Sequence, residues 1–290
     1  LASLMQVVDD TPPERIGPYR IVRELGRGGM GAVYLAERAD GQFEQQVAIK
    51  LIGANCGDDP LHQRFLEERR ILAGLVHHGI ARLYDGGFLD DGRPYLVLEY
   101  VDGLPVTAWC SQQRLCIRDR LRVFVDVCAA VQHAHQRLVI HRDLKPSNIL
   151  VSKGGHVHLL DFGIATLIAN AVTGERPIDM DRLPMTPAYA SPEQVHGEPL
   201  TTASDVYSLG VLLYELLCGQ SPYHVTGRHP SALLKAIVWD TPESPSVRAA
   251  NAPVHAFSTT PARLARELRG DLDRIVPKAM HKDPTARYAS

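Results

Sequence analysis

The sequence reads HRDLKPSN at residues 141–148 and DFG at residues 161–163, and these two stretches carry most of the information about the fold. The first follows the apolar residues 138–140 and contains a carboxylate (Asp143), two cations and an amide (Asn148). Either stretch alone could be an ordinary polar loop or turn. Together they supply what phosphoryl transfer needs: a carboxylate to orient a hydroxyl, a cation for the transferred group, and hard oxygen ligands for magnesium.

Upstream, Gly26, Gly28 and Gly31 form a G-x-G-x-x-G pattern, whose missing Cβ atoms let backbone N–H groups approach phosphates. The pattern also fits a plain hairpin turn or a dinucleotide-binding turn. The latter has to open a helix and to be followed, about 20 positions later, by an acidic residue. Here the β-prone residues 32–35 follow, and Lys50 stands where that acid would be. The sequence therefore favours a β-hairpin over a nucleotide, with a cation beside it.

Lys50 lies in a β-branched segment expected to be half-buried, where an unpaired ammonium would be costly. Glu68 lies in the apolar stripe of the helix expected after Pro60, so it has the complementary problem. For either residue alone, a solvated tip is the simpler interpretation. Together they are expected to neutralise each other, while Lys50 also reaches phosphate oxygens. The neighbouring Glu67 lies off the stripe and is the less favoured partner.

The hydrophobic patterns predict a strand-rich first part and a helical second part. Strands and a hairpin are expected at residues 19–23, 32–35, 46–51, 95–98 and 149–160, and long helices at 121–138 and 203–217. Residues 225–262 are rich in Pro, Ser, Thr and Ala and predict a long, partly irregular connection.

Composition excludes several classes of protein. Lys plus Arg total 31 against 33 Asp plus Glu, so the net charge of -2 offers no basic excess for nucleic acid. The 45% of hydrophobic residues suffices for a globular core. The five cysteines form no CxxC pair, which predicts neither a disulfide framework nor a zinc site. No apolar tract reaches the roughly 20 residues of a membrane span, so a cytoplasmic location is expected.

In this combination the sequence resembles the eukaryotic-type protein kinase superfamily, from about Tyr19 to Tyr288. The family's glycine loop, strand lysine, catalytic loop and DFG stand in order. Residues 186–193, TPAYASPE, stand where the family has its APE segment, and Arg287 matches the family's anchor for Glu193. Residues 191–194, SPEQ, are most similar to the corresponding residues of bacterial serine/threonine protein kinases.

The resemblance implies an α+β, bilobal protein kinase fold, with a small β-rich N-lobe that carries one main helix and a larger, mostly helical C-lobe. It implies an N-terminal tail over residues 1–17 and a kinase domain over residues 18–290. The N-lobe is expected at about 18–98, the hinge at about 99–103 and the C-lobe at about 104–290. The chain does not begin with Met, so we expect an excised fragment, truncated at the C-terminal end of its domain.

The family's catalytic roles carry over residue by residue. Asp143 would orient the substrate hydroxyl, Lys145 would stabilise the γ-phosphoryl group, and Lys50 would hold the α- and β-phosphates. Glu68 and Thr186 complete the expected catalytic set, with Thr186 in contact with Asp143 and Lys145.

The resemblance also assigns the nucleotide and the metal. The expected metal ligands are Asn148 and Asp161. Glu99 and Val101 would offer backbone groups to adenine, and Leu98 would be the gatekeeper. The full set of residues expected to bind the nucleotide is Leu25, Gly26, Gly28, Gly31, Val33, Ala48, Lys50, Leu98, Glu99, Val101, Leu150 and Asp161.

The implied function is ATP-dependent transfer of phosphate to serine and threonine hydroxyls of proteins in bacterial signalling. The cofactors would be ATP and Mg²⁺, with Mn²⁺ as a substitute. The partners would be protein substrates and a second copy of the chain for autophosphorylation. A nucleotide-binding pseudokinase or scaffold is the alternative, but it would need a lost catalytic residue. Small-molecule phosphotransferases share the aspartates but generally lack the segment at 186–193.

The segment from Asp161 to Glu193 is expected to be the control element. Thr173 is its candidate phosphorylation site, and a phosphate there could be ordered by Arg142. Thr166 stands where the family often has a second cation, which weakens this expectation. A flexible, unmodified threonine is the alternative.

Overall fold

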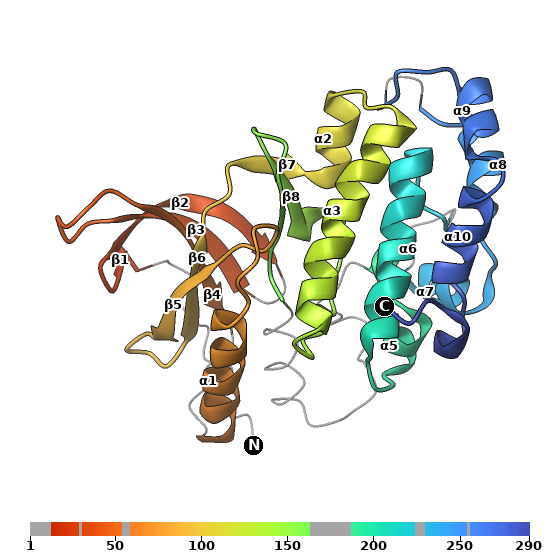
Figure 1. Ribbon diagram of the computed structural model, residues 1–290. Helices are drawn as coiled ribbons and strands as arrows, with labels where there is room; N and C mark the ends of the chain where they lie inside the picture. The colour runs from red at the N-terminus through yellow and green to blue at the C-terminus, as the bar shows by residue number, and fades with distance from the viewer. Residues whose placement is uncertain (1–12, 29–30, 54–58, 163–186, 224–229, 254–255) are drawn as a thin grey trace.

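The computed structural model describes residues 13–28, 31–53, 59–162, 187–223, 230–253 and 256–290. They form a lobe of strands with one helix and a lobe of helices, joined by the chain between β6 and β7 (Figure 1). The first lobe contains β1 (Arg15–Ile16), β2 (Tyr19–Gly28), β3 (Gly31–Arg38), β4 (Gln46–Ile52), α1 (Asp59–Ala73), β5 (Leu83–Phe88) and β6 (Pro94–Glu99). The expected bilobal α+β architecture is confirmed.

The second lobe begins with a small sheet and continues as helices. Its first elements are β7 (Gly103–Pro105), α2 (Val106–Gln112), α3 (Ile117–His135), the short helix η1 (Pro146–Asn148), β8 (Ile149–Ser152) and β9 (Val157–Leu159). They are followed by η3 (Pro187–Tyr189), α5 (Pro192–His196), α6 (Thr202–Cys218), α7 (Pro230–Trp239), α8 (Pro245–Ala249), α9 (Pro261–Leu268), α10 (Leu272–Ala279) and η5 (Pro284–Ala286).

The sheet of the first lobe is antiparallel, with the strand order β1-β2-β3-β4-β6-β5. The predicted strands are confirmed within these elements. The expected tail over residues 1–17 needs a correction, because Arg15–Ile16 pairs with β2 and Ile16 is buried. Helix α1 packs against β5, where Phe88 meets the ring of the fully buried Phe65 at 5.0 Å. Apolar packing therefore holds α1 against one edge of the sheet.

Helix α6 is the centre of the second lobe, and nearly all of its side chains are buried. Its N-terminus is fixed by a capping box between Thr201 and Ser204, and its C-terminus ends at Gly219 with φ +69°. Gly210 allows α10 to approach closely, because a Cβ there would lie 2.8 Å from Met280 Cγ. Helices α3 and α10 pack against α6, which makes α6 a rigid base for the loops above it.

The connection over residues 225–262, predicted to be long and partly irregular, also contains helices. Helices α7 and α8 lie within it, and Leu234 and Ile237 of α7 are buried at helical spacing. The prolines do not prevent these helices, because Pro230 and Pro245 lie at their first positions. The segment is also tied down by the buried Arg120 of α3, whose guanidinium donates to the carbonyls of Cys110, Leu115, Leu216 and Ala256.

Candidate active site

The loop that carries Asp143 is fastened to α6 by one buried carboxylate. Asp205 Oδ2 accepts the N–H of His141 at 2.8 Å, and Oδ1 accepts the N–H of Arg142 at 2.9 Å. Asp205 is 1% exposed. Arg142 has φ +69°, a left-handed conformation that is costly for a residue other than glycine. The two hydrogen bonds that Asp205 accepts stabilise this strained turn.

Asp143, Lys145 and Asn148 form a hydrogen-bonded group at the end of this loop. Lys145 Nζ lies 2.8 Å from Asp143 Oδ2, and Asn148 Nδ2 lies 2.9 Å from the same oxygen. Asn148 Nδ2 also donates to the Asp143 carbonyl at 2.8 Å. The structure thus brings together three of the residues predicted from the HRDLKPSN stretch. The amide of Asn148 is oriented by the two hydrogen bonds of its nitrogen, which leave its oxygen without a hydrogen bond to the described residues.

His141 connects the catalytic loop to the DFG stretch. Its Nδ1 accepts the N–H of Asp143 at 3.4 Å, so Nε2 carries the proton and donates to the Leu160 carbonyl at 2.8 Å. Its ring lies 4.7 Å from the ring of Phe162. Complete burial lowers the pKa of His141, although the Asp205 and Asp143 carboxylates oppose this effect. A neutral imidazole therefore fixes the position of Phe162 beneath Asp161.

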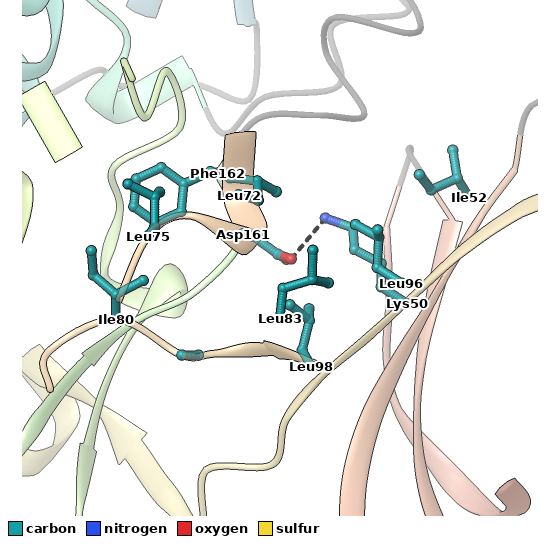
Figure 2. Close-up of a pocket in the computed structure, with 11 residues that line it drawn as sticks. Lys50, Ile52, Leu72, Leu75, Ile80, Leu83, Leu96, Leu98, Asp161 and Phe162 are labelled. Carbon is teal, nitrogen blue, oxygen red and sulfur yellow. Dashed lines mark ion pairs between the residues drawn. The ribbon is translucent and has the colours of Figure 1, made fainter. Parts of the chain in front are cut away.

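Lys50 of β4 pairs with Asp161, whose Oδ1 lies 3.0 Å from Lys50 Nζ (Figure 2). The expected pair between Lys50 and Glu68 is not formed, and no ion pair joins Glu68 to any described residue. Burial raises the pKa of the Glu68 carboxyl, and attraction by Arg142 opposes the shift. The reason for the difference is that Asp161 supplies Lys50 with a carboxylate within contact distance, whereas Glu68 lies nearer to Arg142.

Four predicted nucleotide-binding side chains lie on the strand faces that the lobe cores leave uncovered. On β3, Val33 is partly exposed between buried neighbours. Ala48 and Lys50 of β4 and Leu150 of β8 show the same alternation. Ala48 is paired in register with Leu98 on β6. These side chains therefore lie on the less buried faces of their strands.

The glycine pattern forms the expected β-hairpin, since Gly28 and Gly31 are paired partners on β2 and β3. A Cβ on Gly26 or Gly28 would meet no atom within 4 Å. A Cβ on Gly31, where φ is +131°, would lie 2.0 Å from the Leu51 carbonyl oxygen. Gly31 is therefore required by packing against β4, and Gly26 and Gly28 keep the surface of the hairpin open. Leu25 lies beside them and is 37% exposed.

A pocket lies behind Lys50 and Asp161, with about 440 Å³ of empty space that is partly open to solvent. Figure 2 shows Phe162 and Leu72 on one side of it and Leu83 and Leu98 below. The lining is apolar except for the Lys50–Asp161 pair. Both charges therefore lie beside an otherwise apolar pocket.

Comparison with known families identifies this arrangement. The model of the protein kinase domain matches residues 19–289. The chain belongs to the protein kinase family. The kinase domain is 36% identical over 283 residues to the serine/threonine-protein kinase PknB of Mycolicibacterium smegmatis, covering 96% of the chain and 42% of that protein. It is 37% identical over 294 residues to Pkn1 of Myxococcus xanthus, covering 100% of the chain and 39% of that protein.

Among solved structures, the kinase domain of Mycobacterium tuberculosis PknI aligns with a TM-score of 0.66 and 27% identity, over 95% of this chain and 92% of that one. The chain spans about two fifths of the length of the curated relatives named above. These likenesses show the fold and the family of the kinase domain.

The segment after the DFG stretch returns to the described residues as η3 and α5. Glu193 of α5 is held by Arg287 through two hydrogen bonds of 2.7 and 2.9 Å, which confirms the anchor implied by the resemblance. Burial alone would raise the pKa of Glu193, but the bonds from Arg287 lower it. Thr186, Thr173 and Thr166 lie outside the described residues. Gln194 Nε2 donates to the Arg142 carbonyl at 2.8 Å and so ties α5 to the catalytic loop.

Sequence analysis missed His135, which ends α3. Its Nε2 lies 2.7 Å from Asp205 Oδ2, so it helps to hold the carboxylate that fastens the catalytic loop. One signal could have found it: Val127, Val131 and His135 recur every four residues on the buried face of α3. A histidine at a core position of a helix needs a polar partner.

Proposed function

We propose that the kinase domain transfers the γ-phosphoryl group of ATP, with Mg²⁺, to serine and threonine hydroxyls of proteins, itself included, in bacterial signalling. The proposal is supported chiefly by one observation: the Asp143–Lys145–Asn148 group lies next to the Lys50–Asp161 pair. The backbone carbonyl of Asn148 accepts the N–H of Leu160 at 2.8 Å, so the Asp143–Lys145–Asn148 group lies one residue away from Asp161 and its partner Lys50.

The donor set fits a hard cation. Asn148 and Asp161 offer amide and carboxylate oxygens, the ligands that magnesium prefers. The described residues contain no group of three or more His, Cys, Asp or Glu side chains that could hold a metal by themselves. This agrees with magnesium, which usually takes one or two protein ligands together with waters and substrate phosphates. When bound, the ion would neutralise the charge of the phosphates, and Asn148 and Asp161 would hold it.

The side chains then have separate tasks. Asp143 would accept a hydrogen bond from the substrate hydroxyl and orient its lone pair toward the phosphoryl group. Lys145, already 2.8 Å from Asp143 Oδ2, would place its ammonium beside the transferred group. Lys50 would hold the α- and β-phosphates. Val33, Ala48 and Leu150 would enclose the adenine, while the backbone of Glu99 and Val101 would bind its edge.

The pseudokinase alternative is less well supported. The residues that a pseudokinase commonly loses, among them Lys50, Asp143, Asn148 and Asp161, are all in place here. Lys145, two residues after Asp143, favours serine and threonine as acceptors. Thr186, expected to contact the acceptor, lies outside the described residues and remains part of the proposal.

The proposal is tested by incubating the chain with γ-labelled ATP and dephosphorylated casein. We expect label on casein serine and threonine and on the chain itself, abolished by EDTA and restored by magnesium. ATP binding without transfer to either protein would favour the pseudokinase, and transfer to a small-molecule hydroxyl only would favour a different class. Transfer that survives removal of all metal would contradict the roles of Asn148 and Asp161.

Two further parts of the proposal concern regulation and location. We propose that phosphorylation of Thr173 orders the control segment through Arg142. Phosphosite mapping after incubation with ATP, and the activity of Thr173→Ala, test this: an unmodified Thr173 and a fully active variant would contradict it.

No described helix is long and apolar enough to cross a bilayer. We propose that this domain acts in the cytoplasm and that a second copy of the chain is one of its substrates.

A further inference from the structure

A buried polar cluster beneath α7 has no part in the chemistry described above. It consists of Tyr207 on α6, Tyr223 shortly after that helix, and Lys282 shortly before η5. The two tyrosine hydroxyls are 2.6 Å apart, and Lys282 Nζ lies 2.7 Å from the Tyr223 hydroxyl. Tyr207 is 0% exposed and Tyr223 is 6% exposed. The cluster is therefore a chain of three polar groups in the C-lobe, in which the two tyrosines are buried and Lys282 is partly exposed.

Lys282 has no acid partner within the part of the chain that the structure describes. Glu193 is already engaged by Arg287, and Asp240 attracts the ammonium only from a distance. Lys282 Nζ instead lies 4.8 Å from the centre of the Tyr223 ring and donates to the Ile237 carbonyl of α7. A cation held by neutral partners alone is costly to desolvate. The presence of a lysine at this position therefore calls for an explanation.

Lys282 joins α7 to the anchor of Glu193. Its side chain holds the Ile237 carbonyl, and its own backbone carbonyl accepts from Arg287 Nη2 at 3.0 Å. The guanidinium of Arg287 lies 4.9 Å from the centre of the Tyr207 ring and donates two hydrogen bonds to the Glu193 carboxylate. One residue thus contacts both α7 and the arginine that fixes α5.

Helix α7 in turn packs against η3 and α5, which together span residues 187–196. This segment directly follows Thr186, the residue expected to contact the acceptor hydroxyl. The position of α7 therefore bears on the surface where a protein substrate would dock. Other groups fasten the catalytic loop, namely Asp205, or would hold the nucleotide, namely Lys50 and Asp161.

We propose that Lys282 is a positioning residue whose ammonium holds α7 against residues 187–196 and thereby sets the affinity for protein substrates. This inference rests on the proposed kinase activity and deepens it. The positive charge is essential to the role, because the contacts with the Tyr207 and Tyr223 rings are cation–π contacts.

The charge of Lys282 can be changed by pH. Burial, above all, lowers the pKa of Lys282 to about 8; repulsion by Arg287 adds to this effect and attraction by Asp240 opposes it. Burial raises the pKa of Tyr223 to about 12 and raises that of Tyr207 strongly as well. Glu193, whose pKa is lowered by Arg287 against the effect of burial, stays ionised. Within this cluster, Lys282 is the group that changes charge between about pH 7 and pH 9.5.

The experiment measures the KM for dephosphorylated casein, the KM for ATP and kcat from pH 6.5 to 9.5. At pH 7 we expect Lys282→Met to raise the KM for casein roughly 3- to 30-fold, the factor that corresponds to a desolvated cation–π contact. The KM for ATP and kcat should stay within about twofold. In the wild type, the KM for casein should rise toward the Lys282→Met value as pH passes 8.

Lys282→Arg is the matched control, because a guanidinium keeps its charge throughout this range. Its KM for casein should lack the rise near pH 8, which also separates the effect from titration of casein itself. An equal rise in the arginine variant would overturn the proposal, and so would a parallel increase of both KM values in Lys282→Met. If Lys282→Met does not fold, Tyr223→Phe replaces it, with a smaller increase expected because only the hydroxyl link is lost.

A second measurement does not depend on activity. Amide hydrogen exchange at pH 7 should show roughly 10-fold less protection of residues 230–239 in Lys282→Met than in wild type, with the strands of the first lobe unchanged. Unchanged protection of α7 would overturn the role of Lys282 even in an inactive chain. Faster exchange of α7 in Lys282→Met than in wild type, together with a wild-type chain that transfers no phosphate, would mean that the kinase proposal had failed and the contact had not.

Discussion

The two halves of the active site are held in different ways. In the C-lobe half, the buried Asp205 carboxylate bonds two successive N–H groups of the catalytic loop, and Asn148 bonds Asp143 twice. In the N-lobe half, Lys50 has one ion pair, and Glu68 has none with any described residue. The C-lobe half is therefore held by several hydrogen bonds, whereas the N-lobe half depends on one ion pair and is expected to rearrange more readily.

The electrostatic environment supports this contrast. Burial raises the pKa of Glu68, so its charged form lacks full compensation where it lies. A movement of α1 that brought Glu68 to Lys50 would supply that compensation and release Asp161 from Lys50. No comparable exchange is open to Asp205, whose oxygens are fully used by the loop and by His135. Mutations should therefore separate the two halves.

The largest effect is expected from Asp143→Asn. Loss of the carboxylate removes the group that orients the hydroxyl, which should lower turnover by about 10²- to 10⁴-fold. The substitution keeps the shape of the side chain next to Asn148, so folding and ATP affinity should remain. Turnover on casein and ATP binding by calorimetry would be compared in parallel.

Asp90→Asn is the matched control for Asp143→Asn. Asp90 is exposed in the turn between β5 and β6. It should behave as wild type in both assays. A near wild-type rate of casein phosphorylation by Asp143→Asn would show that the catalytic assignment is wrong.

The second prediction concerns the C-lobe half of the active site, and the quantity measured is the free energy of unfolding. Asp205→Asn leaves one oxygen for the N–H groups of His141 and Arg142, and the amide nitrogen faces one of them. The loss of a buried, charged acceptor should cost about 2–4 kcal/mol in the free energy of unfolding. Urea denaturation measures it, with the exposed Asp126→Asn of α3 as control. Equal stability of the two variants would mean that Asp205 does not fasten the loop.

A third prediction tests the N-lobe half of the active site by double-mutant cycles. In the free protein, Lys50→Met and Asp161→Asn should be coupled by about 0.5–2 kcal/mol in stability, whereas Lys50→Met and Glu68→Ala should be additive. In turnover, the second pair should be no worse than Lys50→Met alone, because both residues would act as one unit during the reaction.

Glu67→Ala serves as the control for Glu68→Ala, since Glu67 is exposed on the same helix. It should leave stability and turnover unchanged. Additive losses of turnover for Lys50→Met and Glu68→Ala would show that Glu68 does not act through Lys50. Coupling of Lys50 to Glu68 in the stability of the free protein would show that the pairing with Asp161 is not its resting state.

These contrasts also explain which features of the fold and the site could be predicted from the sequence. Asp143, Lys145 and Asn148 lie within one short segment, so local spacing fixes their neighbourhood, and the structure brings them together as expected. Strand β4 was predictable because buried and partly exposed side chains alternate along it, and the helix around Gly210 because its long run of mostly apolar residues fits a buried, central helix. Local pattern and packing agree at these places.

The remaining features depend on distances through space. Whether Lys50 meets Glu68 or Asp161 is decided by the position of α1, which no local pattern encodes. Helix α7 was hidden by its flanking Pro and Ser, although its buried Leu234 and Ile237 have helical spacing. The contact of Lys282 with α7 joins residues 45 positions apart and could only be found in the fold.

The smallest effect is expected at Leu138, and it separates strain that serves the site from strain that does not. Arg142 and Asp161 have positive φ, and both belong to the active site. Leu138 also has a positive φ of +60°, but its side chain is 92% exposed and touches none of the catalytic groups described above. Its strain is therefore expected to be removable.

Leu138→Gly should raise the free energy of unfolding by about 0.5–1 kcal/mol, because glycine adopts this conformation without the Cβ clash. Leu138→Ala keeps the Cβ and should give no gain, which distinguishes backbone strain from exposure of an apolar side chain. Thermal unfolding of the two variants measures the difference. Turnover should be unchanged in both, since Asp205 and not the turn at Leu138 fixes His141 and Arg142. A stabilised but slower Leu138→Gly variant would mean that the turn contributes to the geometry of the loop, and that the C-lobe half of the site begins at the end of α3.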